Sequence, residues 1–293
     1  MNETRIGALE NVRTGWGESA RWDEALQRLY FVDCASNAFA WCDVASPGVV
    51  GRVALPSLPT AVYLTTDIDR VLVQLNEGLY AVVPSRGQAS LAIAMPPDED
   101  RFNDGVADSA GAIVTGSLLL APAGAPAAGR YWRYAPPAGW ACIHEGKGNT
   151  NGPCVSADGR HLYVADSTAS LIYRFDYLPS GELGGETVFA DTRSLGGLPD
   201  GATLDAEGCL WSAIVGGSCV AKFAPDGALL RVVTLPTSHP TSVAFGGRNL
   251  DILYVTTIGA AMLGIEPAGE LAGALLLIEG LESQGSASVR CPY

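Results

Sequence analysis

The chain contains an internal repeat, and this repeat restricts the possible folds more than any other feature of the sequence. Six segments share one form: a short apolar run, a turn containing Asp or Gly, and a second run that resembles Leu-Tyr-Val. Their anchor residues stand at intervals of 42, 43, 48, 49 and 41 residues and are Glu18, Thr60, Asn103, Asn151, Asp200 and Thr241. Strand-like repeats with a period of about 40 to 50 residues are typical of a β-propeller with four strands per blade.

The remainder of each repeat also has the character of β-strands. Runs rich in β-branched and aromatic residues follow the first hairpin, as in 171–177 and 187–191, and turn-forming residues bound them. No segment has the sustained periodicity of a long helix, and we expect the Ala-rich run 271–280 to be a strand because it follows the sixth anchor. The sequence therefore predicts an all-β fold, a single six-bladed propeller over residues 1–293. The alternative is a pair of β-sandwiches with an accidental period.

The two ends of the chain complete this prediction. The sixth repeat is one strand short, and residues 6–12 precede the first anchor without belonging to any repeat. We predict that these N-terminal residues form the outer strand of the last blade. This pairing closes the ring and protects sheet edges that are otherwise open to other chains.

Composition excludes several classes of function. The chain has 18 Lys+Arg against 31 Asp+Glu, a net charge of −13, so it repels polyphosphate and we expect no nucleic-acid partner. The N-terminus lacks the apolar core of a signal peptide, and prolines interrupt the uncharged stretch 109–129, so we expect no membrane segment. The seven widely spaced cysteines predict buried, reduced thiols in a cytoplasmic protein. Oligomeric state is left open.

The anchors carry the candidate chemistry. Each begins the innermost strand of its repeat, where a side chain can point into the central channel. Glu18, Asn151 and Asp200 are oxygen donors that suit a divalent cation with open positions for water or substrate. They belong to the first, fourth and fifth repeats, so they converge only if the ring closes. Taken singly, each also fits a turn or an exposed loop.

The third repeat adds further polar residues in the run Arg-Phe-Asn-Asp-Gly. Arg101, Asn103 and Asp104 are candidates for binding a polyhydroxylated or anionic substrate at the same mouth. The alternative is a surface turn, because Asn-Asp-Gly is a common turn sequence. The three histidines lack zinc-binding spacing and no G-x-S-x-G motif is present, so a histidine-rich zinc site and a nucleophilic serine are not supported.

Several of these motifs occur together in one known family. In order, they are GESARW (17–22), RFNDG (101–105), NGP (151–153), SADGRHLYVAD (156–166), PDGATLDAEGCLW (199–211) and PTSVAFGG (240–247). The chain resembles the senescence marker protein/gluconolactonase/luciferin-regenerating family, which includes regucalcin. The resemblance extends over nearly the whole chain, and its strength lies in the ordered set of motifs.

This resemblance implies a six-bladed propeller with one catalytic divalent metal ion. It places the ion on Glu18, Asn151 and Asp200, assigns Arg101 and Asn103 to substrate binding, and gives Asp200 a part in proton transfer. Many members hydrolyse sugar lactones and others act on phosphoryl fluorides. The metal varies among calcium, zinc, magnesium, manganese and iron. We therefore expect a metal-dependent sugar lactonase of carbohydrate metabolism, with Ca²⁺ or Zn²⁺ as the foremost candidates.

One stretch departs from the family pattern. The family usually has W-x-G-T-M after the third anchor and an acidic residue soon afterwards, whereas this chain has Ala112–Leu118 and then Leu-Leu-Ala-Pro. We expect residues 118–121 to make the wall of the pocket more apolar. This keeps open a metal-dependent hydrolase of a non-sugar lactone, an ester or a phosphotriester. A non-enzymatic, calcium-binding propeller is the second alternative.

Overall fold

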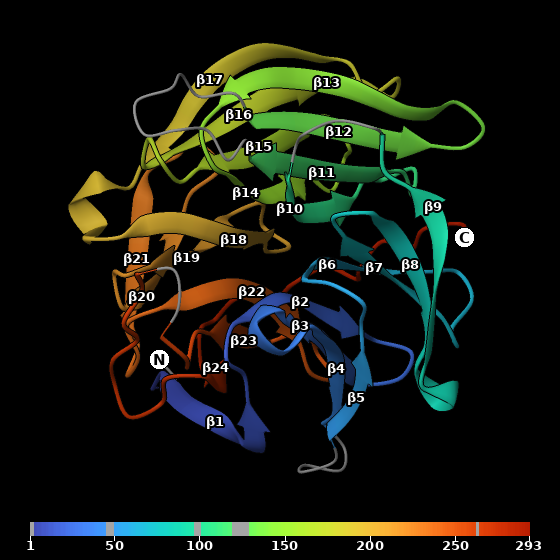
Figure 1. Ribbon diagram of the computed structural model, residues 1–293. Helices are drawn as coiled ribbons and strands as arrows, with labels where there is room; N and C mark the ends of the chain where they lie inside the picture. The colour runs from blue at the N-terminus through green and yellow to red at the C-terminus, as the bar shows by residue number, and fades with distance from the viewer. Residues whose placement is uncertain (1–2, 45–49, 97–100, 119–128, 262–263) are drawn as a thin grey trace.

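Six four-stranded antiparallel sheets surround a central axis in the computed structural model (Figure 1). The structure describes residues 3–44, 50–96, 101–118, 129–261 and 264–293. We call each sheet a blade and number the blades along the chain. The strands of each blade are given from the inside outward. Blade 1 consists of β2 (Gly17–Asp23), β3 (Arg28–Asp33), β4 (Ala38–Asp43) and β5 (Val50–Ala54), and blade 2 consists of β6 (Pro59–Leu64), β7 (Val71–Leu75), β8 (Gly78–Val83) and β9 (Gln88–Ala94). Blade 3 consists of β10 (Arg101–Ala107), β11 (Ile113–Leu118), β12 (Gly129–Ala135) and β13 (Gly139–Lys147).

The other three blades follow the same plan. Blade 4 consists of β14 (Thr150–Val155), β15 (His161–Asp166), β16 (Leu171–Tyr177) and β17 (Leu183–Asp191), and blade 5 consists of β18 (Leu198–Leu204), β19 (Leu210–Val215), β20 (Cys219–Phe223) and β21 (Leu229–Thr234). Blade 6 consists of β22 (Pro240–Gly246), β23 (Ile252–Thr257), β24 (Ala274–Glu279) and β1 (Arg5–Arg13). The six innermost strands contact one another in sequence around the axis, and β22 contacts β2. The predicted six-bladed propeller is confirmed.

The N-terminal strand closes the ring, as predicted from the incomplete sixth repeat. Strand β1 pairs antiparallel with β24, with Arg5 opposite Glu279 and Ile6 opposite Ile278. The Ala-rich run is a strand over 274–279, also as predicted. In the described ranges the helices are three-residue 3₁₀ turns, η1 (Cys34–Ser36), η2 (Pro84–Arg86) and η3 (Arg193–Leu195), and none has the length and apolar character to cross a membrane.

The hydrophobic core is divided among the interfaces between blades. Six clusters of buried side chains each join two neighbouring blades; one of them packs Trp22 and Leu29 of blade 1 against Tyr254 and Leu275 of blade 6. Strands buried on both faces have nearly continuous apolar sequences, as in β6 and β22. All seven cysteines are free thiols; six are buried, and Cys142 is exposed, contrary to the expectation that all would be buried.

Every innermost strand contains one β-bulge at the position of its anchor. Where the innermost strand of a blade pairs with the second strand, the innermost strand has one extra residue. The six shifts lie between Glu18 and Arg21, Pro59 and Ala61, Phe102 and Gly105, Asn151 and Cys154, Pro199 and Ala202, and Pro240 and Ser242. A bulge leaves a residue unpaired and turns its side chain out of the regular alternation. Each of these six bulges includes an anchor residue or directly follows one, so strand pairing is interrupted where the anchors lie.

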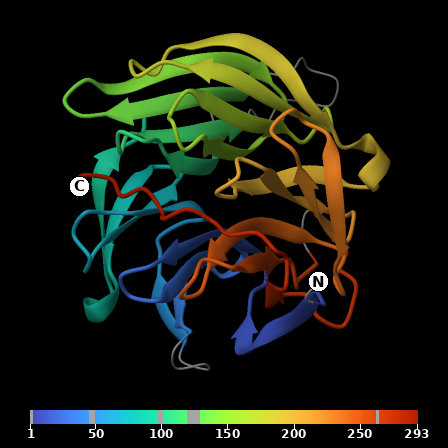
Figure 2. The same cartoon turned by 180° about the vertical axis from the view of Figure 1, so that it is seen from behind.

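The C-terminal segment 281–293 crosses the face of the ring that carries the inner-to-second strand turns (Figure 2). It forms isolated bridges with blade 5, between Gly285 and Asp205, and with blade 2, between Cys291 and Thr65. Cys291 is completely buried, and the ring of Tyr293 lies 5.7 Å from that of Tyr134 in blade 3. The segment therefore links blades that are not neighbours in the chain.

Candidate functional site

The structure brings the predicted site residues together in the channel. A cavity of about 40 Å³ is lined by Glu18, Arg101, Asn103, Asp104 and Asn151. Its other lining residues are Trp16, Cys34, Leu58 and Thr60. The cavity has room for only a few water molecules. The chain thus places five of the six predicted residues, from blades 1, 3 and 4, around one small space.

The sixth predicted residue, Asp200, lies beside this cavity. Its side chain is buried, with 7% exposure, and the backbone N–H of Gly201 donates to its carboxylate. Burial raises the pKa of Asp200 well above its ordinary value, and the negative charges of Glu18 and Asp104 raise it further. The carboxylates of the first and fifth repeats therefore lie close enough to affect each other's ionisation.

Glu18 has donors on two sides. The indole Nε1 of Trp16 donates to Glu18 Oε1 at 3.1 Å, and the backbone N–H of Ser19 also donates to the carboxylate. Ser19 adopts a positive φ of 52° in the bulge. Desolvation nevertheless raises the pKa of Glu18 from 4.5 to about 8, and the neighbouring charge of Asp104 adds to the effect.

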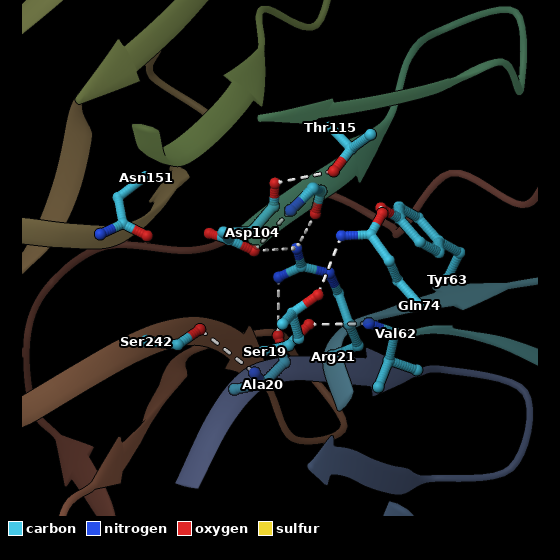
Figure 3. A network of polar contacts seen from close by, with 12 residues as sticks. Ser19, Ala20, Arg21, Val62, Tyr63, Gln74, Asp104, Thr115, Asn151 and Ser242 are labelled. Atoms are coloured by element: carbon cyan, nitrogen blue, oxygen red, sulfur yellow. Dashed lines mark hydrogen bonds and ion pairs between the residues drawn. The ribbon is translucent and has the colours of Figure 1, made fainter. Parts of the chain in front are cut away.

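Asp104 is paired with an arginine that sequence analysis did not single out. Arg21 Nη2 lies 3.8 Å from Asp104 Oδ1 and donates to the carbonyl oxygen of Gly105 at 2.6 Å. Figure 3 shows Arg21 reaching from β2 toward Asp104, with Asn151 on the other side of Asp104. Burial still raises the pKa of Asp104 above its usual value. Asp104 thus lines the cavity, and its carboxylate is paired with the guanidinium of Arg21.

The two asparagines form one hydrogen-bonded unit. Asn103 Nδ2 donates to Asn151 Oδ1 at 2.6 Å and to the carbonyl oxygen of Thr150 at 2.8 Å. On its other side, Asn151 Nδ2 donates to Ser167 Oγ at 3.0 Å. The amide oxygen of Asn151 therefore faces Asn103 and the cavity, and the amide nitrogen points into the protein.

The charges of the site are suited to a divalent cation. Three buried or half-buried carboxylates, those of Glu18, Asp104 and Asp200, have pKa values raised mainly by burial, and for Glu18 and Asp200 also by the neighbouring negative charges. In the described part of the chain, Glu18 and Asp200 take part in no ion pair, and Arg21 is engaged by Asp104. Hard oxygen donors without a cationic partner are what a divalent metal ion requires. The residues present therefore fit such an ion.

A second group of acidic and thiol side chains has a structural explanation. Asp205, Glu207 and Cys209 lie within metal-binding distance of one another in the turn after β18. However, Asp205 Oδ2 pairs with Lys222 Nζ at 3.0 Å and accepts from Trp211 Nε1 at 3.1 Å. Its Oδ1 accepts from the backbone N–H groups of residues 207 and 209. The oxygens are used to hold the turn, so we assign no metal to this group.

A larger cavity, about 500 Å³, opens at the opposite mouth of the channel. It is lined by the far ends of the inner strands and by 286–289 of the C-terminal segment. Arg21 lines this cavity while its partner Asp104 lines the smaller one, so their pair separates the two spaces. The predicted site residues other than Asp200 line only the smaller cavity, and we place the chemistry there.

Some functional candidates were missed by sequence analysis. Trp16, Cys34, Thr60 and Leu58 line the cavity, and Arg21 pairs with the lining residue Asp104. Arg21 lies inside the first motif, three residues after the anchor, which is the only signal that marked it. The predicted apolar wall at 118–121 lies outside the residues whose side chains the structure describes.

Comparison with known proteins shows which family the chain belongs to. The sequence profile of the SMP-30/Gluconolactonase/LRE-like region matches residues 16–259. The chain is 33% identical to the pentonolactonase XacC of Haloferax volcanii over 90% of each chain, and 31% identical to a 6-deoxy-6-sulfogluconolactonase of Pseudomonas putida over 88% of each. Among solved structures it is similar to a luciferin-regenerating enzyme, with a TM-score of 0.91, 25% identity and coverage of 99% of this chain and 100% of that chain. The chain therefore belongs to the SMP-30/gluconolactonase/LRE-like family.

Proposed function

We propose that this protein is a metal-dependent lactonase that opens the ring of a sugar lactone. The observation that carries the proposal is that Glu18 and Asn151 line one small cavity, while the buried carboxylate of Asp200, from a third blade, interacts electrostatically with Glu18. The names of the relatives from Haloferax volcanii and Pseudomonas putida support a lactone as the substrate class. The free thiols are consistent with the cytoplasmic location that we expect.

Glu18, Asn151 and Asp200 would hold the ion through their oxygen atoms. When bound, a divalent cation supplies positive charge that polarises the lactone carbonyl and stabilises the developing oxyanion. The donor set is composed of hard oxygens, which suit Ca²⁺, Mg²⁺ or Mn²⁺, while Zn²⁺ and Fe²⁺ also accept such ligands. Beside such a charge, Asp200 would be ionised at neutral pH in spite of its burial.

Asp200 is the proposed general base. Its carboxylate accepts a proton from the water that attacks the carbonyl carbon, and the bond from that carbon to the ring oxygen then breaks. Asp200 returns the proton to the ring oxygen, so that water is added across the ester bond and a hydroxy acid is released. Neither a serine nor a cysteine nucleophile is needed.

Arg101 and Asn103 are proposed to orient the substrate. Both line the cavity at its channel side, where guanidinium and amide groups can bind hydroxyl or carbonyl oxygens. A space of about 40 Å³ admits the reacting carbonyl but not a whole sugar ring. The ring must therefore lie outside the cavity, toward the mouth. Asp104, whose carboxylate is beside Arg21, acts at the base of this arrangement rather than at the mouth.

The test is to strip the protein of metal, reconstitute it with each candidate ion and measure acid release from a panel of aldonolactones and aryl esters. We expect lactone hydrolysis only with added metal, and a fall of at least about a hundredfold in kcat for Asp200→Asn. Asp205→Asn, the same change on a carboxylate of the opposite face, should leave turnover by the folded protein unchanged. Full turnover by folded Asp200→Asn, or activity confined to aryl esters, would refute the proposal.

A further inference from the structure

We propose that Ser167 is a positioning residue that fixes the orientation of the Asn151 amide, so that Oδ1 and not Nδ2 faces the cation. The inference rests on the proposed function, because it depends on Asn151 acting as a metal ligand. Ser167 lies in the turn between β15 and β16 and is only 2% exposed. It lines neither the smaller nor the larger channel cavity.

The direction of the hydrogen bonds at Ser167 follows from the chemistry of its partners. Ser167 Oγ lies 2.6 Å from the carbonyl oxygen of Pro199. A carbonyl oxygen can only accept, so the single hydroxyl proton of Ser167 is committed to this bond. Toward Asn151, at 3.0 Å, Ser167 Oγ can therefore only accept. The atom of Asn151 that faces Ser167 must be the NH₂ group.

Because Nδ2 of Asn151 faces Ser167, Oδ1 must face the cavity. An asparagine side chain has nearly the same shape when its oxygen and nitrogen are exchanged, so packing alone distinguishes the two orientations poorly. In Figure 3 the oxygen of Asn151 is turned toward Asp104 and the nitrogen away from it. An orientation with NH₂ toward the cavity would present two hydrogens, and no lone pair, to a cation.

Asn103 supplies a second constraint, but of a different kind. Its Nδ2 donates to Asn151 Oδ1, and it is only partly buried at the channel. Asn103 is also proposed to bind substrate, so this contact competes with its other role. Ser167 has no such competing role, because its hydroxyl is enclosed by protein atoms. It holds the Asn151 amide whether or not substrate is present.

Ser167 also links the two blades that carry Asn151 and Asp200. The backbone N–H of Ser167 donates to the carbonyl oxygen of Asn149 at 2.9 Å, just before β14 of blade 4, while its side chain donates to Pro199 in blade 5. Pro199 immediately precedes Asp200 in the chain. One side chain thus constrains the approach of both proposed ligands, Asn151 and Asp200.

The experiment is calorimetric titration of the metal-stripped protein with Ca²⁺ and with Mn²⁺. We expect Ser167→Ala to raise Kd by tenfold to a hundredfold, the usual effect of losing a partner that orients a metal ligand. Ser212→Ala, which removes a buried hydroxyl in blade 5 that donates to the carbonyl of Ala213, should keep the wild-type Kd. Ser167→Cys fills the same space with a weak donor and acceptor, and its Kd should also rise.

The outcomes separate this inference from the proposed function. Glu18→Gln removes a proposed ligand and must abolish or strongly weaken binding of both ions. If it does so while folded Ser167→Ala and Ser167→Cys keep a Kd within twofold of the wild type, the role of Ser167 is wrong and the metal site stands. If Glu18→Gln binds both ions like the wild type, the metal site itself is wrong. Should Ser167→Ala fail to fold, the Ser167→Cys titration decides.

Discussion

The acidic residues of the channel share one local arrangement. In each case the N–H of the following residue donates to the carboxylate: Ser19 to Glu18, Gly105 to Asp104 and Gly201 to Asp200. These N–H groups lie at the bulges, where strand pairing is interrupted. A carboxylate that accepts a backbone N–H favours its ionised form, yet burial raises all three pKa values. The local donors thus offset only part of the cost of burying these charges.

This balance predicts how the stability of the metal-free protein depends on pH. The pKa of Glu18 is raised from 4.5 to about 8, so between these values the folded state binds more protons than the unfolded state. The free energy of unfolding therefore falls as pH rises from about 4.5 to about 8. We expect the Tm of chelator-treated protein to decrease over this range, and added Ca²⁺ to raise Tm more at pH 8 than at pH 5.

The matched variant for this measurement is Glu18→Gln, which has no charge to bury. Its Tm in the metal-free state should depend less on pH than that of the wild type, with the largest difference near pH 8. An identical pH slope in the two proteins would show that Glu18 is not the group responsible.

The sequence was enough to propose which anchor residues form the site, but it did not indicate which other residues contact them. Glu18, Asn151 and Asp200 occupy equivalent positions in a visible repeat, so their convergence follows from ring closure alone. Ser167 and Arg21 donate hydrogen bonds to residues of other blades, Pro199 and Gly105, which lie 32 and 84 positions away along the chain. Such contacts depend on how neighbouring blades are rotated against each other, and no local pattern encodes that rotation.

At the scale of single elements, the bulges connect the strands to the chemistry. Gly152, in the bulge of β14, has a positive φ of 51°. A Cβ atom at this position would lie 2.4 Å from the carbonyl oxygen of Asp200. The backbone of blade 4 therefore approaches that of blade 5 as closely as a glycine permits, and this approach brings the two proposed ligands together.

We predict that Gly152→Ala lowers the free energy of unfolding by more than the cost of placing an alanine at a positive φ. A non-glycine residue at positive φ costs on the order of 1 kcal/mol or more, and the clash with Asp200 adds to this. Gly196→Ala is the control, because Gly196 also has a positive φ, 73°, but a Cβ there meets nothing within 4 Å. Denaturant unfolding should give a larger loss for Gly152→Ala. Equal losses would mean that blade 4 relaxes freely at this position.

Strand number and order could be predicted, but strand register could not. The hydrophobic pattern and the turn residues of each repeat are local signals, and they predicted four strands per blade. A bulge shifts pairing by a single residue, as between Asn151 and Cys154, and both registers satisfy the same pattern of apolar residues in a strand that is buried on both faces. Only the contacts between blades select the register that is observed.

The whole molecule is held by interfaces between blades and by two closures at the ends of the chain. Strand β1 completes blade 6, and the C-terminal segment crosses the face opposite the candidate site. Arg290 of this segment pairs with the buried carboxylate of Asp23 in blade 1, at 2.5 Å, and Cys291 exchanges backbone hydrogen bonds with blade 2. The first closure was predicted from the incomplete repeat. The second was not, because 281–293 lacks any strand pattern.

Removal of residues 285–293 should therefore lower stability without changing chemistry. The truncation exposes apolar surface in the interface between blades 2 and 3 and leaves Asp23 buried without its partner. We expect Tm to fall by about 5–10 °C, equivalent to a few kcal/mol in a chain of this size. The kcat/KM for the best lactone, measured on folded protein at 25 °C, should match the wild type. Loss of activity at unchanged Tm would contradict this assignment.

The pairing of β1 with β24 has a consequence for biosynthesis. The segment that becomes β1 leaves the ribosome well before its partner β24, which is made more than 260 residues later. At roughly 5–20 residues per second, this segment waits many seconds with its hydrogen-bonding edge unsatisfied. Nascent chains are therefore exposed to wrong pairing at this segment, and chaperone dependence should be greatest in the interval before β24 is made.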